Sequence, residues 1–280
     1  MPPSRMLAVR PDMPMATRPR FGGRIPMKAV MTHIMRRKRR YATLPFFACL
    51  RDERLPPRVR LGFMPGFAFF VMAFGDLNRY VPRKAPVGDA QQARVNAHTC
   101  EDDHHWPWFL EDLDELSWNR AATTTDALRA LWSEDTHRCR LLMYEPCAIV
   151  EAADGVERLA IVEAIEETGN VLFALTIRLA AEVQAETGRE LRYMGAHHFA
   201  LETGHMRNGE HAKASRIVLD DAKRRRCIAL VDRVFDSFAA WTHEAVREIA
   251  RAASPRRRVR RRVETIPSFG YFSLVTGVKP

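Results

Sequence analysis

The chain has 280 residues, a hydrophobic content of 46% and a formal net charge of +10. The basic residues gather at the two ends: residues 1–60 hold 15 Lys and Arg against 3 Asp and Glu, and residues 254–280 hold 7 against 1. The body between them is therefore acidic, which disfavours nucleic acid as a partner. Its apolar content is sufficient for a packed globular core.

The cysteines and the apolar runs disfavour two further classes of protein. The five cysteines are odd in number and form no Cys-x-x-Cys pair, which argues against a disulfide framework and against a structural zinc site. A reducing, cytoplasmic location is therefore expected. The first 40 residues contain no apolar signal segment. The longest uncharged run, 61–75, is shorter than the roughly 20 residues of a spanning helix, so we expect a core helix there and no membrane association.

The two ends of the chain differ in composition from the body. Residues 1–40 are rich in Pro and Arg without sustained periodicity, which predicts a disordered basic extension. The basic block 36–40 is interpreted as part of this solvated extension rather than as a nucleic-acid or targeting signal. Residues 41–253 are expected to form the helical domain, and residues 254–280 an Arg-rich C-terminal tail.

Helical periodicity runs through the whole body of the chain. A helix over 88–117 is expected to bend near Pro107, and a helix over 123–134 to begin at Thr124 or Thr125. No segment shows the strict alternation of apolar and polar residues that is typical of strands. The sequence therefore predicts an all-α bundle of about seven helices. The expected helical segments are 43–54, 57–80, 88–117, 123–134, 156–187 and 190–206. Residues 135–153 are expected to form a helix and a loop around Pro146, and residues 210–252 one long helix or a pair of helices.

The segment from His198 to His205, which reads HFALETGH, is the most informative motif. In a helix, His198, Glu202 and His205 lie at positions i, i+4 and i+7 and share one face. That face carries an imidazole, a carboxylate and an imidazole, whereas His197 points elsewhere. A helix whose histidines are satisfied by neighbouring protein groups is the simpler alternative.

A second cluster lies upstream, from His98 to His105. Within it, Glu101 can share a helical face with His104 or with His105, and His98 can share one with His105. Three aromatic residues follow at 106–109, which indicates that this part of the helix is buried and that its polar groups need partners. The alternative is a surface helix whose acidic run is solvated and whose histidines are incidental.

The helix expected between these clusters supplies further carboxylates. Glu163 and Glu166 flank its apolar stripe, and Glu167 is expected to point more outward. An amphipathic helix with an acidic rim is the default interpretation. Glu166, which lies beside Gly169, is the preferred inward carboxylate, with Glu163 close behind it.

Together the three helices can supply several carboxylates and imidazoles to one site. A mixed set of this size suits two metal ions. Zinc prefers a smaller set that is richer in thiolate or imidazole, and magnesium prefers oxygen ligands alone. Iron is therefore the expected metal, with manganese as the alternative.

With these motifs the chain resembles the haem-oxygenase-like dimetal oxidases and oxygenases, which are helical relatives of haem oxygenase and thiaminase II that bind non-haem iron. The resemblance covers roughly residues 42–245 and excludes both basic ends. The passages that carry it are Phe46–Leu55, Phe69–Phe74, Glu101–Leu113 and the closing His198-x-x-x-Glu202-x-x-His205 pattern.

The resemblance implies a haem-oxygenase-like seven-helix bundle and an iron-dependent oxidase or oxygenase. Two Fe(II) ions per chain would activate dioxygen and oxidise or cleave a small organic substrate that is amino-acid-like or fatty-acid-like. An external or substrate-derived reductant is implied. A homodimer is one possible oligomeric state. The implied metal ligands are Glu101, His104 or His105, Glu163 or Glu166, His198, Glu202 and His205. Aromatic residues expected to line the substrate pocket are Phe63, Phe67, Phe70, Phe74, Trp106 and Phe109.

Three other functions are compatible with parts of the sequence. A metal-independent hydrolase like thiaminase II needs a nucleophilic cysteine near a carboxylate, for which Cys100 and Cys147 are the candidates. Haem binding through a histidine is disfavoured by the many carboxylates. A non-enzymatic helical binding protein would use the Arg-rich ends.

Overall fold

The computed structural model describes residues 25–118, 123–207 and 214–254, and for residues 202–207 it describes the backbone alone. Of the described residues, 77% are helical and 2% lie in strands. The expectation of an all-α fold is confirmed. The Arg-rich C-terminal tail and most of the N-terminal extension lie outside the described residues.

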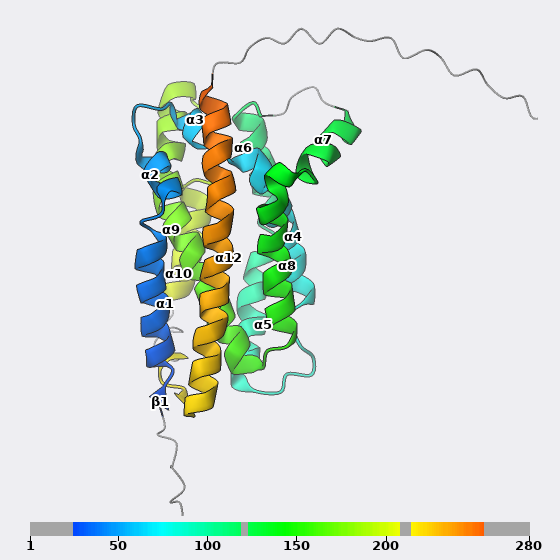
Figure 1. Ribbon diagram of the computed structural model, residues 1–280, viewed down its shortest axis with the longest axis vertical. Coiled ribbons are helices and arrows are strands. Elements are labelled where there is room, and N and C mark those ends of the chain that lie inside the picture. The colour runs from blue at the N-terminus through cyan, green and yellow to red at the C-terminus, as the bar shows by residue number, and fades with distance from the viewer. Residues whose placement is uncertain (1–24, 119–122, 208–213, 255–280) are drawn as a thin grey trace, which may run out of the picture.

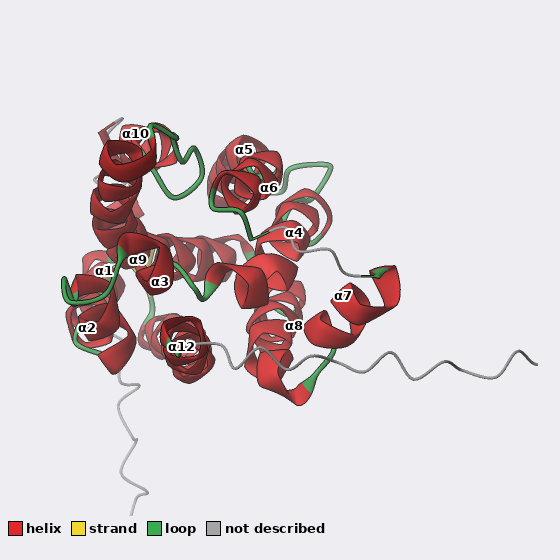
Figure 2. Ribbon diagram, turned by 90° about the horizontal axis from the view of Figure 1, so that it is seen from above, coloured by secondary structure: helices red, strands yellow, loops and turns green. Residues whose placement is uncertain are grey.

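Two long helices run along most of the length of the bundle (Figure 1). Helix α9 spans Gly155–Thr187 and packs along α12, which spans Asp221–Ala253. Helix α1, Lys28–Tyr41, packs against both of them, and α8, His137–Glu151, packs against α12. Seen from above, α4 and α5 lie on the opposite side of the bundle from α1 and α2 (Figure 2). The site described below lies among α4, α5, α9 and α10.

Local sequence signals set the bounds of α9. The Asp154 side chain accepts a hydrogen bond from the backbone N–H of Glu157, and the Glu157 side chain accepts one from the N–H of Asp154. This reciprocal pair satisfies two backbone donors at the start of the helix. Gly188 ends the helix in a left-handed conformation, with φ of 72°, which glycine adopts at little steric cost. These two signals fix where α9 begins and ends, and therefore the positions of its glutamates along the helix axis.

The expected disordered extension is wrong for residues 28–40, which form most of α1. Val30, Met31, Ile34 and Tyr41 are buried on one side of this helix and belong to the main hydrophobic core. Their spacing gives an apolar face of the kind that holds a helix against a core, although arginines dominate the local composition. Before α1, the short strand β1, Ile25–Pro26, pairs antiparallel with β2, Val218–Leu219.

Two helices that were expected to be continuous are each divided in two. The segment 57–80 forms α3, Pro57–Arg60, and α4, Met64–Tyr80. The segment 88–117 forms α5, Ala90–Asp102, and α6, Trp106–Glu115, with Pro107 in the first turn of α6. Proline is tolerated in a first turn because its nitrogen needs no partner there, so the chain breaks before Pro107 rather than bending at it.

Shorter helices complete the fold. Helix α2 spans Pro45–Arg51, and α10 spans Ala196–Arg207. Helix α7, Thr124–Leu131, has no buried residue and projects from the body (Figures 1 and 2). Its N-cap is Thr123, one residue earlier than expected. The turn η1, Glu134–Thr136, leads into α8.

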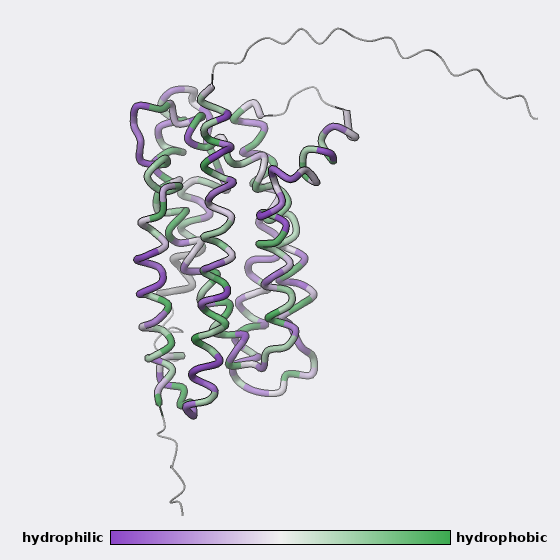
Figure 3. Tube along the Cα trace, in the orientation of Figure 1, coloured by the Kyte–Doolittle hydropathy of each residue, from purple (hydrophilic) through white to green (hydrophobic). Residues whose placement is uncertain are grey.

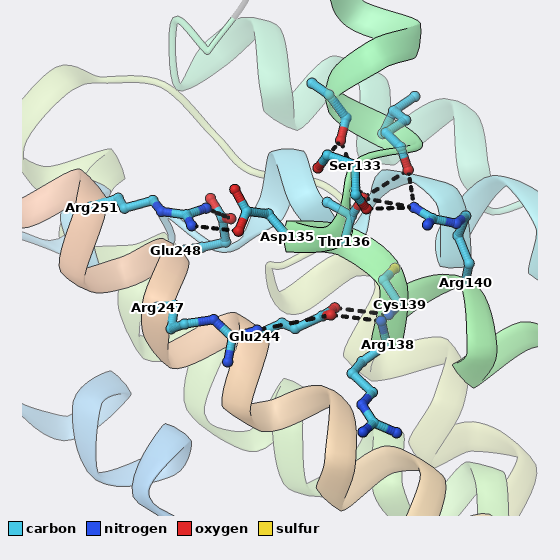
Figure 4. A network of polar contacts seen from close by, with 12 residues as sticks. Ser133, Asp135, Thr136, Arg138, Cys139, Arg140, Glu244, Arg247, Glu248 and Arg251 are labelled. Atoms are coloured by element: carbon cyan, nitrogen blue, oxygen red, sulfur yellow. Dashed lines mark hydrogen bonds and ion pairs between the residues drawn. The ribbon is translucent and has the colours of Figure 1, made fainter.

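A buried carboxylate joins α12 to the start of α8. Glu244 accepts hydrogen bonds from the backbone N–H groups of Arg138, at 2.6 Å, and of Cys139, at 2.9 Å (Figure 4). A carboxylate is favourable at a helix N-terminus because the unpaired N–H groups there carry partial positive charge. This contact fixes α8 against α12 from its first turn.

The core contains the apolar run that was expected to be a core helix. Phe63, Met64, Phe67, Phe70 and Val71 are all buried. Hydrophobic positions recur along the helices between hydrophilic ones (Figure 3). Within the described ranges, no helix is both long and apolar enough to cross a membrane.

Candidate metal centre

Helices α5 and α9 bring three ligand-type side chains together in the bundle. His98 and Asp102 lie one turn apart on α5, and Glu166 projects from α9. The Nε2 atom of His98 is 3.2 Å from Oδ2 of Asp102 and 3.1 Å from Oε1 of Glu166. One potential ligand atom from each residue lies within 4.8 Å of the others. We call these residues the α5–α9 cluster.

The position of this cluster follows from the faces of the two helices. Asp89 caps α5 by accepting hydrogen bonds from the N–H groups of Gln91 and Gln92, both at 2.8 Å. Val95, Thr99 and Asp102 are then buried toward α9 at helical spacing. His98 is one turn before Asp102 and shares its face.

The environment of His98 in the cluster favours its protonated form. Burial lowers the pKa of His98, but the charge of Glu166 and the hydrogen bond to Asp102 outweigh that effect, so the pKa stands well above its ordinary value. An imidazolium between two carboxylates is a stable arrangement in itself. A dication could replace the extra proton of His98, because the two carboxylates already stabilise a positive charge at this position.

One carboxylate oxygen of the cluster has no hydrogen-bond partner among the residues that the structure describes. Asp102 is 4% exposed, and its Oδ1 atom is buried without a hydrogen bond among the described residues. A buried charged oxygen in this condition is costly unless a cation or a donor occupies the adjoining space. This oxygen is an independent indication that the cluster fits a metal ion.

A histidine pair lies next to the cluster. The Nδ1 atom of His105, in the turn that begins α6, is 3.0 Å from Nε2 of His198 on α10. Both residues are buried, with 7% and 3% of their surfaces exposed. The Nδ1 atom of His198 lies 3.0 Å from the carbonyl oxygen of Tyr193. Because a carbonyl only accepts, Nδ1 of His198 donates and the lone pair is on Nε2, as in a metal-binding histidine.

Aromatic rings hold this histidine pair in place. The His105 ring stacks on Trp108, with ring centroids 4.7 Å apart and an interplanar angle of 17°. The His198 ring packs against Phe173 and Tyr193, each at 4.5 Å between centroids. Rings packed on both sides restrict the imidazole rotamers, so the nitrogen atoms are oriented before any ligand binds.

Asp112 positions the segment that leads into α10. It is fully buried on α6 and accepts hydrogen bonds from the backbone N–H groups of Arg192, Tyr193 and Met194 at 2.6, 3.2 and 2.8 Å. Burial raises the pKa of Asp112 to about 6, although these three donors favour its charged form. The contact joins α6, which follows His105, to the backbone that carries His198.

Residues of the α5–α9 cluster and of the histidine pair line one aromatic cavity. Its volume is about 60 Å³, which is room for a few water-sized molecules. Asp102, Glu166, His105 and His198 all line it. No Lys or Arg appears among its described lining residues. The aromatic residues in its wall are Tyr41, Phe67, Phe70, Phe74, Trp106, Phe173, Tyr193, Phe238 and Trp241.

The structure brings together three of the side chains that were expected to be ligands. His105, Glu166 and His198 line the cavity. His104 is exposed and contacts Asp103 at 3.3 Å, so of the two adjacent histidines His105 is the one that faces inward. Glu202 belongs to the closing motif on α10, but its side chain lies outside the described residues.

Two other expected ligands, Glu101 and Glu163, are not part of the described cluster, and the side chains of two more lie outside the description. Glu101 is exposed on α5, because one residue along a helix turns the side chain by roughly 100° away from Asp102. Glu163 is half-buried and is absent from the described cavity wall. His205, like Glu202, has no described side chain. Of the expected aromatic wall, Phe63 and Phe109 are core residues that do not line the described cavity.

His98 and Asp102 were not among the expected ligands, although His98 belonged to the upstream cluster. A solvated acidic run was one of the two interpretations of 101–103, but the buried face of α5 includes Asp102. The signal available in the sequence was the His98-x-x-x-Asp102 spacing, which is one helical turn. Glu167 was expected to point outward, and this is wrong: it is buried and pairs with Lys38 of α1.

The two candidate nucleophilic cysteines lie apart from this cavity. Cys100 is exposed on α5, and Cys147 is half-buried on α8. Burial raises the pKa of the Cys147 thiol, which disfavours the reactive thiolate. Neither residue is among the described residues that line the cavity.

Comparison with protein-family models and with curated proteins finds no match for this chain.

Proposed function

We propose that this protein is a non-haem iron oxidase or oxygenase of the haem-oxygenase-like type, with a site for two metal ions. The observation that carries the proposal is the placement of Asp102, Glu166, His105 and His198 around one aromatic cavity. One buried oxygen of Asp102 has no partner in the described part of the chain. Carboxylates and imidazoles from several helices of a bundle are the donor set of iron and manganese proteins.

The first metal ion would be held by His98, Asp102 and Glu166. The second would be held by His105 and His198, with Glu202 and His205 of the closing motif as further ligands. When bound as Fe(II), the two ions supply the electrons with which dioxygen is activated, and an external or substrate-derived reductant restores them. His98 must lose the proton on its imidazole before it can bind a metal ion.

The cavity supports a substrate whose reacting part is apolar. Phe67, Phe70, Phe74 and Trp241 form a series of stacked rings along its wall, with centroid distances of 4.4 to 5.3 Å. Such a wall excludes water from the reacting centre and orients a hydrocarbon or aromatic group. We therefore propose a small organic substrate whose apolar end enters the aromatic cavity.

Metal content tests this proposal directly. The full chain would be loaded with Fe(II) without oxygen, and its iron would be measured by elemental analysis before optical spectra are recorded on adding oxygen. We expect about two irons per chain and a new visible band. His198→Ala and Glu202→Ala should each reduce the bound iron while helicity by circular dichroism is unchanged. Unchanged iron content in both variants would refute the proposal.

A thiol-alkylation experiment separates this function from hydrolysis by a cysteine. Activity of the oxidase should be lost with a chelator and retained after alkylation of the accessible Cys100. Activity that survives the chelator and is lost on alkylation would support the thiaminase II-like alternative instead.

A further inference from the structure

A second and smaller cavity lies on another side of the α5–α9 cluster. Its volume is about 10 Å³, which is close to the space that one water molecule needs. His98, Asp102 and Glu166 all line it, and Asn78 of α4 lines it with them. The rest of the described wall is apolar, so the polar groups around this small space are the cluster and one amide.

The amide of Asn78 has an unused donor. Asn78 is 4% exposed, and its Nδ2 atom has no hydrogen-bond partner in the part of the chain that the structure describes. Its helix neighbour Leu77 is buried in the core. A buried donor without a partner destabilises a fold by about 1–3 kcal/mol, and leucine of nearly the same shape would avoid that cost. The amide therefore indicates an acceptor that occupies the small cavity.

The acceptor must be small, and its charge must be compatible with the neighbouring carboxylates of the α5–α9 cluster. A space of this size holds one heavy atom, and Asn78, His98, Asp102 and Glu166 all line it, so an atom in this space lies near the amide and near the cluster. Two carboxylates would repel an anion in the metal-free protein. With a metal ion in the cluster, an oxygen ligand in the small cavity would be attracted by the ion and would accept a hydrogen bond from Nδ2 of Asn78.

We propose that Asn78 is a positioning residue that donates a hydrogen bond from Nδ2 to a single-atom oxygen ligand, water or hydroxide, on the metal ion of the α5–α9 cluster. This inference rests on the proposed metal site. Asp102 and Glu166 line both cavities, so an ion held by them would be next to the small cavity with Asn78 and next to the aromatic cavity, where dioxygen and substrate would enter.

Fluoride is a suitable probe because it is a single-atom anion that accepts hydrogen bonds as hydroxide does. The full chain loaded with Co(II) would be titrated with fluoride and, separately, with azide, and the visible spectrum of the metal would report binding. Asn78→Leu should weaken fluoride binding about tenfold, the effect of losing one hydrogen bond to a charged ligand. Azide has three atoms and does not fit the small cavity, so its affinity should be the same in both proteins.

Thr176→Val is the matched control. The Oγ1 atom of Thr176 is also buried without a described partner, but Thr176 lines neither cavity. Loss of the Thr176 hydroxyl should leave the affinity for fluoride unchanged. If Asn78→Leu does not fold, Asn78→Ala removes the same donor without adding bulk.

The outcomes distinguish the inference from the proposed function. Equal fluoride affinity in wild type and in the Asn78 variants, with Co(II) bound in all of them, overturns the role of Asn78 and leaves the metal site standing. Failure of the wild-type protein to bind Co(II) or Fe(II) overturns both. A fluoride defect that appears equally in Thr176→Val overturns the inference, because it would then reflect a general change in packing.

Discussion

The Nε2 atom of His198 lies 3.0 Å from Nδ1 of His105, although 93 residues separate them in the chain. Both rings are buried, and the carbonyl oxygen of Tyr193 sets the tautomer of His198. Asp112 fixes the backbone just before α10 by accepting hydrogen bonds from three backbone N–H groups. The pair is therefore held by the fold itself, and this rigidity is what a metal site requires.

The unpaired oxygen of Asp102 gives the first prediction. Asp102→Asn keeps the size of the side chain and removes its charge, so it should lower Fe(II) affinity by at least tenfold while the helical content is unchanged. Isothermal titration under anaerobic conditions measures the affinity. Asp103→Asn is the control, because Asp103 pairs with Arg83 at 2.6 Å outside the cluster. Equal losses in the two variants would argue for a general charge effect.

The elevated pKa of His98 predicts how the stability of the metal-free protein depends on pH. A histidine whose pKa is raised by folding stabilises the fold fully below its unfolded pKa, near 6.5, and this contribution is lost as the pH rises through the folded value. Wild type should therefore exceed His98→Gln in free energy of unfolding by about 1 kcal/mol below pH 6.5. The difference should shrink toward alkaline pH.

Urea unfolding at several pH values measures this difference. His104→Gln is the control for removing a nearby histidine, since its side chain is exposed on the surface and outside the cluster. A difference between wild type and His98→Gln that stays constant with pH would mean that His98 is not the cation between the two carboxylates.

Gly169 provides a way to fill the aromatic cavity without touching a ligand. A Cβ atom added there would meet only Phe173, at 3.6 Å, which is ordinary contact. Gly169→Leu should therefore fold, gain about 0.5–1 kcal/mol from helix propensity, and block the cavity. Xenon binding followed by NMR should be seen in wild type and lost in Gly169→Leu. Gly169→Ala adds less volume and should keep some binding, whereas unchanged binding in Gly169→Leu would place the xenon elsewhere.

Asp112 should be important for stability and for metal binding together. Asp112→Ala leaves the buried N–H groups of Tyr193 and Met194 and the part-buried N–H of Arg192 without their acceptor, so we expect a loss of about 2–4 kcal/mol in the free energy of unfolding. Fe(II) affinity should fall as well, because His198 follows this segment. Asp112→Asn retains one acceptor oxygen and should lose less. Glu111→Ala removes an exposed ion pair with Arg192, at 3.6 Å, and should change stability little.

Several features of the fold could be predicted from local sequence. The long helix α9 begins at a capping pair that starts with Asp154 and ends at Gly188, and both signals act within a few residues of the chain. The closing motif, with polar residues spaced by four and three, indicated a helix, and it lies within α10. Helix α1 was missed because its arginines outweighed a short apolar stripe around Val30 and Ile34 in the local composition.

The choice among neighbouring candidate ligands depended on tertiary structure. Glu101 and Asp102, His104 and His105, and Glu163 and Glu166 are all plausible donors at the level of sequence. Helical periodicity says which side chains share a face, but the neighbouring helices determine which face is buried. The packing of α5 on α9 turned Asp102 and Glu166 inward, and the break before α6 turned His105 toward His198.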